Sequence, residues 1–130
     1  MNTTAAGIGI SRVGQIAVNA QDVERAANFY QNVLGLKLLF KAPPGLVFFD
    51  CGGVRLMLSR PEKPEFDHPS SILYFVVPDI QGAFGKMKAN GVEFEDEPHL
   101  LAKMPDHDLW MTFFRDSEGN LMGLMSEVKR

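Results

Sequence analysis

The chain has 130 residues, of which 45% are hydrophobic and 22% charged, and its formal net charge at pH 7 is −3. This composition is ordinary for one soluble globular domain, and the lack of a basic surplus argues against nucleic-acid and membrane partners. One cysteine, Cys51, excludes an intrachain disulfide. We find neither a membrane-length apolar run nor a secretory signal, and we therefore expect a cytoplasmic protein.

The first half of the chain is predicted to form a β-α-β-β-β unit, after a loose arm over residues 1–11. Alternating apolar residues predict a strand over 13–19 that buries Ile16 and Val18. Asp22 is suited to cap the next helix, which ends at Gly35. Strands over 36–40, 46–49 and 54–59 follow, separated by turns rich in proline and glycine.

A linker over 61–70 leads to a second half with the same order of elements. A strand over 72–77 precedes a helix that Asp79 caps and Gly91 ends, and strands over 92–94 and 109–114 follow. An irregular insertion, EPHLLAKMPDHD, has no counterpart in the first half. We expect a single domain over 1–130 with modules at 12–60 and 71–128, because each half alone is too small for a stable core.

The two halves align as an internal repeat. Asp79 follows Asp22 by 57 residues, whereas Asp116 follows Asp50 by 66 and Gly119 follows Gly53 by 66. The repeat shows where a side chain of one module has its counterpart in the other.

With this repeat, the chain resembles the vicinal oxygen chelate superfamily of glyoxalases, bleomycin-resistance proteins and extradiol dioxygenases. The matching phrases are VNAQDVERAANFY at 18–30, VPDI at 77–80 with NGV at 90–92, and FFRDSEGN at 113–120. The resemblance implies the α+β glyoxalase/bleomycin-resistance fold, in which two βαβββ modules form a cup-shaped mixed sheet with helices on the outside. We expect a homodimer, and both a cup built within one chain and a cup built by modules exchanged across the dimer stay open.

The four metal-ligand positions of that family fall on Gln15, Met57, Ile72 and Gly123. The repeat agrees, because Ile72 follows Gln15 by 57 residues and Gly123 follows Met57 by 66. Isoleucine and glycine side chains offer no lone pair, a thioether suits copper(I), and a single glutamine cannot hold a catalytic zinc. We therefore expect no metal and no other cofactor, and we interpret the family's metal site as lost.

The same positions predict a mostly apolar cup for a small organic molecule. The expected ligand-binding residues are Gln15, Asn19, Arg55, Met57, Tyr74, Trp110, Phe113 and Met125. Metal-free bleomycin-resistance proteins sequester a drug in such a groove. A scaffold role, in which these side chains only fill the space between the sheets, stays open.

A lyase- or isomerase-type enzyme is the second hypothesis. His99 and His107 bracket the insertion, and facing each other beside Asp106 or Asp108 they would supply a relocated metal site or a general base. Tyr74 and Gln15 are further acid–base candidates. His68 in the linker is expected at the surface, and Cys51 is a nucleophile candidate if the backbone N–H groups of its glycine turn lower the thiol pKa.

Overall fold

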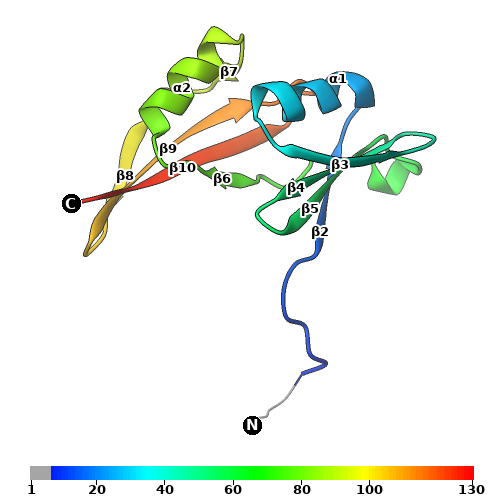
Figure 1. Ribbon diagram of the computed structural model, residues 1–130, viewed down its shortest axis with the longest axis horizontal. Helices are drawn as coiled ribbons and strands as arrows, with labels where there is room; N and C mark the ends of the chain where they lie inside the picture. The colour runs from blue at the N-terminus through cyan, green and yellow to red at the C-terminus, as the bar shows by residue number, and fades with distance from the viewer. Residues whose placement is uncertain (1–6) are drawn as a thin grey trace.

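Two mixed β-sheets, each covered on one side by a helix, make up the computed structural model, which describes residues 7–130 (Figure 1). The elements are β2 (Gln15–Asn19), α1 (Val23–Asn28), the π-helical turn η1 (Phe29–Val33), β3 (Lys37–Ala42), β4 (Leu46–Cys51), β5 (Val54–Ser59), the 3-10 turn η2 (Pro64–Phe66), β6 (Tyr74–Val76), α2 (Ile80–Ala89), β7 (Glu93–Phe94), β8 (His99–Lys103), β9 (His107–Arg115) and β10 (Leu121–Lys129). The predicted α+β class is confirmed. No helix within residues 7–130 has the length and hydrophobicity to cross a membrane.

The two sheets have the same topology. The first has the strand order β2-β5-β4-β3 and the second β6-β10-β9-β7, with β8 on the same edge of β9 as β7. In each sheet the opening strand pairs in parallel with the closing one, and the other pairs are antiparallel. Met57 is the register partner of Ala17, and Gly123 is the register partner of Tyr74. Tyr74 follows Ala17 by 57 residues and Gly123 follows Met57 by 66, which are the offsets of the repeat in the sequence.

The first helix differs from the expected continuous α-helix. Asp22 caps it as predicted, since its Oδ1 accepts from the Arg25 N–H at 3.0 Å, and Gly35 ends the segment with φ of 77°. After Asn28, however, the chain widens into a π-helical turn in which the Leu34 N–H donates to the Phe29 carbonyl. The wider turn lets Phe29 and Tyr30, adjacent in sequence, both face the core.

In the second module the insertion is not irregular, which corrects the prediction. Residues His99–Lys103 form β8, which pairs antiparallel with the first half of β9. The strand before α2 is shorter than predicted and spans only Tyr74–Val76, so Ile72 precedes it. Because β9 has partners on both sides, it is the central strand that the sequence predicted.

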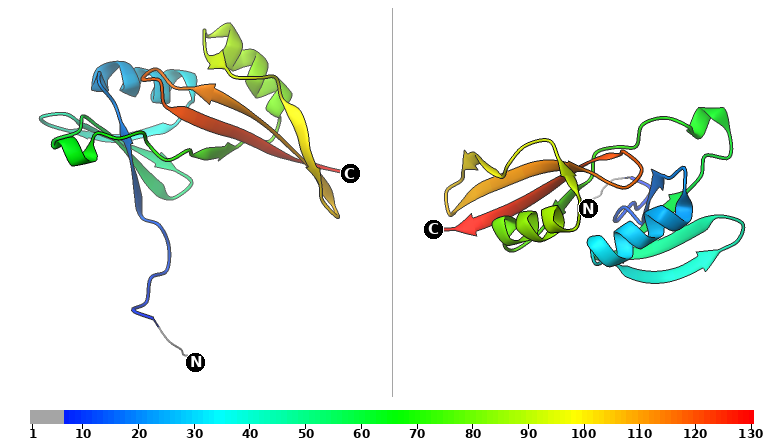
Figure 2. Two further views of the ribbon diagram at one scale, coloured as in Figure 1. Left: turned by 180° about the vertical axis from the view of Figure 1, so that it is seen from behind. Right: turned by 90° about the horizontal axis from the view of Figure 1, so that it is seen from above.

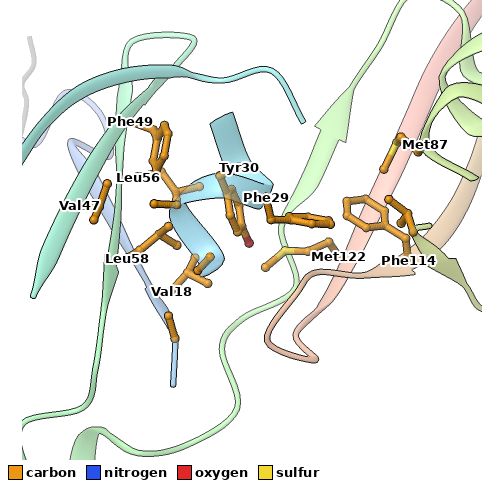
Figure 3. Packing of buried hydrophobic residues seen from close by; sticks show 14 of the residues in the cluster. Val18, Phe29, Tyr30, Val47, Phe49, Leu56, Leu58, Met87, Phe114 and Met122 are labelled. Atoms are coloured by element: carbon orange, nitrogen blue, oxygen red, sulfur yellow. The ribbon is translucent and has the colours of Figure 1, made fainter. Parts of the chain in front are cut away.

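A single hydrophobic core runs through both modules. Phe29 and Tyr30 lie between the side chains of the first sheet and Met122 and Phe114 of the second (Figure 3). The Tyr30 ring is fully buried and packs 6.2 Å from that of Phe49. Burial of this apolar surface is the main contribution to the stability of the fold.

Polar contacts also join the modules, where the turn between β9 and β10 reaches α1. The buried Tyr30 hydroxyl donates to Asp116 Oδ2 at 2.7 Å. Burial, followed by the Asp116 charge, raises the pKa of Tyr30 far above its usual value. Glu118 accepts from Arg25 Nε at 2.7 Å and from the Asp22 N–H at 2.9 Å. The hydrogen bond from Arg25 is the main reason why the pKa of Glu118 falls to about 2.

The helices α1 and α2 lie on the same side of the two sheets, which sit next to each other along the long axis of the molecule (Figure 2). Residues 7–14 contain no helix or strand and lead away from the body on the side opposite the helices (Figure 1). They fit the predicted loose arm, whose residues 1–6 lie outside the described part of the chain. The helices thus leave the other side of each sheet uncovered by any helix.

Candidate ligand-binding surface

We call the side of each sheet that faces away from α1 and α2 its open face. In β5, Leu56 and Leu58 enter the core, so Arg55 and Met57 lie on the open face. In β6, Phe75 packs against the core, and Tyr74 and Val76 point the other way. These orientations agree with the alternation of side chains between the two faces that the sequence predicted for both strands.

Aromatic and polar side chains contact one another on the open face of the first sheet. Gln15 Oε1 accepts from Arg55 Nε at 2.8 Å, and Gln15 Nε2 lies 3.7 Å from the Met57 sulfur. The Arg55 guanidinium stands over the Phe48 ring, 5.3 Å from its centroid, and Phe48 stacks on Phe40 at 4.5 Å. Three of the predicted ligand-binding residues are thus brought together here.

The open face of the second sheet is aromatic. The Tyr74 ring meets the edge of Phe113 at 5.8 Å between centroids, and it lies against Gly123, its register partner on β10. A Cβ at position 123 would stand 2.6 Å from Tyr74 Cδ2. Met125, two residues along β10, shares this face. Three further residues of the predicted ligand-binding set, Tyr74, Phe113 and Met125, thus lie on one surface.

The side chains at the four metal-ligand positions do not suit a divalent metal ion. Gln15 already accepts a hydrogen bond from a cation, Met57 offers a thioether, and Ile72 and Gly123 carry no donor atom. The space beside Gly123 is taken by the Tyr74 ring. Among residues 7–130, no three His, Cys, Asp or Glu side chains are grouped closely enough to hold a metal ion.

Two of the predicted ligand-binding residues lie apart from the others. The Asn19 side chain donates to the carbonyls of Phe66 and His68 and so fastens the linker to β2. Trp110 alternates with Met111 and Phe113 along β9 and packs against the core cluster. Its indole therefore lies on the helix side of the second sheet.

The structure does not bring His99 and His107 together. His99 is the register partner of Met111, which lies four residues from His107 along β9, so the two are separated by about 13 Å along the hairpin. Each has a carboxylate of its own: Asp96 Oδ2 lies 3.1 Å from His99 Nδ1, and Asp106 Oδ1 lies 2.7 Å from His107 Nδ1. The hydrogen bond with His107 lowers the pKa of Asp106.

Cys51 does not have the environment that the sequence suggested. Burial raises the pKa of its thiol, and the neighbouring Asp50 charge raises it further. The pKa thus shifts in the direction opposite to the lowering that the glycine turn suggested, which favours the neutral thiol over the nucleophilic thiolate.

A cavity of about 850 Å³ lies between the two modules. Residues of η1, the β4–β5 turn, β6 and α2 line it, among them Asn32, Cys51, Tyr74, Val76 and Lys86. Since side chains from both faces of β6 contribute, the cavity runs along the edge of β6 that does not pair with β10. Of the predicted ligand-binding residues, Tyr74 lines this cavity.

The sequence did not reveal this cavity or the stacked pair of Phe40 and Phe48. The cavity depends on how the modules pack, which no local pattern encodes. In the apolar run of β4, Val47, Phe48 and Phe49 are all hydrophobic, so alternation does not show that Phe48 faces away from the core. Only the pairing with Met57 on β5 assigns it to the open face.

One family model and one curated relative match most of the chain. The model of the Glyoxalase/Bleomycin resistance protein/Dioxygenase superfamily matches residues 12–124. The uncharacterized protein YetH of Bacillus subtilis (strain 168) is 30% identical over 122 residues, which cover 86% of this chain and 95% of YetH.

Solved structures show the same fold. A member of the same superfamily from Sphaerobacter thermophilus DSM 20745 superposes with a TM-score of 0.76 at 24% identity, covering 91% of this chain and 98% of that one. TnmS3, an antibiotic binding protein from Streptomyces sp. CB03234, superposes with a TM-score of 0.74 at 24% identity, covering 93% and 99%.

Proposed function

Because this chain belongs to the Glyoxalase/Bleomycin resistance protein/Dioxygenase superfamily, we propose that it binds a small organic molecule on its open faces without a metal ion. The proposal takes the family's metal site as degenerate. It assigns the ligand to the aromatic and thioether side chains that lie at and beside the former ligand positions.

One observation carries the proposal. Tyr74 is half exposed, lies over Gly123, meets Phe113 edge-on and lines the cavity between the modules. A tyrosine so placed offers a flat apolar surface with a polar tip, which suits recognition of an organic ligand. The cavity of about 850 Å³ adjoins the open face of the second sheet at Tyr74, and its volume is within the usual range for pockets that hold small organic ligands.

The fold of TnmS3, which binds an antibiotic, supports a small-molecule role for this architecture. The residues that a ligand would contact here are Gln15, Arg55, Met57, Tyr74, Phe113 and Met125. Met57, Phe113, Met125 and the Tyr74 ring offer apolar surface beside the polar groups of Gln15 and Arg55, so a ligand with an apolar ring system held by a small number of polar contacts fits best.

A homodimer is part of the proposal. Phe40, Tyr74 and Val76 are exposed by 47%, 50% and 69% in the single chain. Phe40 lies on the first sheet and Tyr74 and Val76 on the second, and large exposed apolar side chains on uncovered sheet faces are typical of interaction surfaces. We propose that a second copy covers part of this surface, which light scattering coupled to size-exclusion chromatography measures.

A thermal-shift screen of the EDTA-treated protein against flat aromatic compounds tests the proposal. A ligand that binds only the folded state raises the unfolding temperature, and we expect Tyr74→Ala to remove that rise. Phe66→Ala is the matched control, because the Phe66 ring is also exposed by 50% but lies in η2 of the linker. If no compound raises the unfolding temperature, or if Tyr74→Ala leaves the rise unchanged, the proposal is wrong.

A further inference from the structure

A row of charged and polar side chains crosses the open face of the first sheet. By strand register it runs from Lys37 through Asp50 and Arg55 to Gln15. The row holds two cations and one carboxylate, so its balance is positive in a chain whose net charge is −3. A local positive balance of this kind favours an anionic ligand.

Arg55 is held in a defined pose within this row. Its Nε donates to Gln15 Oε1 at 2.8 Å, and its guanidinium lies 5.3 Å from the centroid of the Phe48 ring. Phe48 is itself fixed by its stack with Phe40. Stacking on an aromatic ring orients the guanidinium plane before any ligand arrives, which lowers the entropic cost of binding.

The guanidinium keeps donors for a ligand. It has five N–H groups, and the contact with Gln15 uses the one on Nε. No carboxylate within residues 7–130 forms an ion pair with Arg55, and its neighbour Asp50 accepts instead from the Gly53 N–H at 3.2 Å. The two Nη groups thus form a planar fork that matches a carboxylate, sulfonate or phosphate.

We propose that the ligand is a flat aromatic compound that carries an anionic group, and that Arg55 binds this group. The inference rests on the proposed function and names the class of its ligand. The anionic group lies on the Nη atoms of Arg55, and the ring system packs on the neighbouring apolar surface of Phe40 and Met57.

Two fluorescent probes with one ring system test this inference. Anilinonaphthalene sulfonate is anionic, whereas phenylnaphthylamine is the same aromatic skeleton without the sulfonate. We expect the wild type to bind the sulfonate more tightly, and we expect Arg55→Gln to weaken sulfonate binding by about tenfold while leaving the neutral probe unchanged. Arg55→Lys retains the charge and is expected to keep part of the preference.

Lys88→Gln is the matched control, because Lys88 is also a cation over a phenylalanine ring, 5.4 Å from Phe84, but lies on α2. It is expected to change neither affinity. If the wild type binds both probes equally, or if Arg55→Gln leaves sulfonate binding unchanged, the inference is overturned and the proposed function stands. If neither probe binds to the wild type, the inference is overturned, and the thermal-shift screen decides the proposed function on its own.

Discussion

The Tyr74 ring occupies the space that any side chain at position 123 would need. A Cβ added to Gly123 would lie 2.6 Å from Tyr74 Cδ2 and 3.0 Å from Cε2, both inside van der Waals contact. In the first module the corresponding pair is Ala17 beside Met57, so the larger residue of the pair lies on the closing strand there and on the opening strand in the second module. The aromatic ring of Tyr74 thus fills the space beside Gly123, one of the four positions that the proposal assigns to the family's metal ligands.

Gly123→Ala should displace the Tyr74 ring. Since the ring is half exposed and free to rotate outward, we expect a modest loss of about 1 kcal/mol in the free energy of unfolding. Chemical denaturation of four proteins, the wild type, both single variants and the double variant with Tyr74→Ala, measures the effect. In the Tyr74→Ala background the same change should cost much less, and equal costs in both backgrounds would contradict the contact.

Glu118→Gln should weaken the join between the modules. The variant loses the negative charge of the carboxylate whose oxygens accept hydrogen bonds from the Arg25 guanidinium at 2.7 and 3.0 Å. We therefore expect the free energy of unfolding at pH 7 to fall by about 1.5 kcal/mol. Glu95→Gln is the control, because the Glu95–Arg115 pair is open to solvent and worth less than about 0.5 kcal/mol.

The same pair predicts a pH dependence. The pKa of Glu118 is about 2 in the folded chain against an ordinary 4.5, so its carboxylate stabilises the fold above pH 4.5. That contribution is lost as the pH falls from 4.5 through 2. The difference in unfolding free energy between the wild type and Glu118→Gln should therefore shrink over this range, and a constant difference would show that the charge is not responsible.

Tyr30→Phe removes the buried hydroxyl that donates to Asp116 at 2.7 Å. Asp116 keeps its bonds from the N–H groups of Glu118 and Asn120, so we expect a loss of about 1.5 kcal/mol in unfolding free energy rather than unfolding of the chain. Tyr74→Phe makes the identical chemical change at a half-exposed site and should cost less than about 0.5 kcal/mol. Similar losses in both variants would argue against the bond to Asp116.

His107→Ala separates the binding role from the enzymatic hypothesis. His107 pairs with Asp106 at the start of β9, away from the open-face residues Arg55 and Tyr74. Binding of a ligand from the screen should change by less than about twofold, as distant sites usually act independently. Turnover of a carbonyl substrate by the wild type, lost in His107→Ala, would instead favour a lyase or isomerase.

The sequence predicted the repeated module because local patterns encode it. Helix caps at Asp22 and Asp79 and the alternation in β2 and β5 each depend on neighbours close in the chain. The conversion of the insertion into β8 was missed, because pairing with β9 rather than strict alternation defines that strand. The π-helical turn was missed as well, since its hydrogen bonds leave no sequence signature.

For the candidate site, the sequence predicted the alternation of faces along β5 and β6 and placed Gly123 and Met125 of β10 on the same surface as Tyr74. It did not predict the position of Trp110, because the run from Leu109 to Phe114 is apolar on both faces and its register comes from β10. It also did not place the cavity between the modules, which depends on contacts such as Tyr30 with Asp116 that join distant parts of the chain. The ligand-binding set, the module boundaries and the cytoplasmic location stay predictions.

Metal retention tests the central claim most directly. The wild type and Gln15→Ala are each incubated with zinc, nickel, manganese and iron, dialysed, and analysed by inductively coupled plasma mass spectrometry. We expect every metal to remain far below one ion per chain in both proteins, because Gln15, Met57, Ile72 and Gly123 do not form a donor set. Retention of one ion per chain by the wild type, lost in Gln15→Ala, would contradict the account.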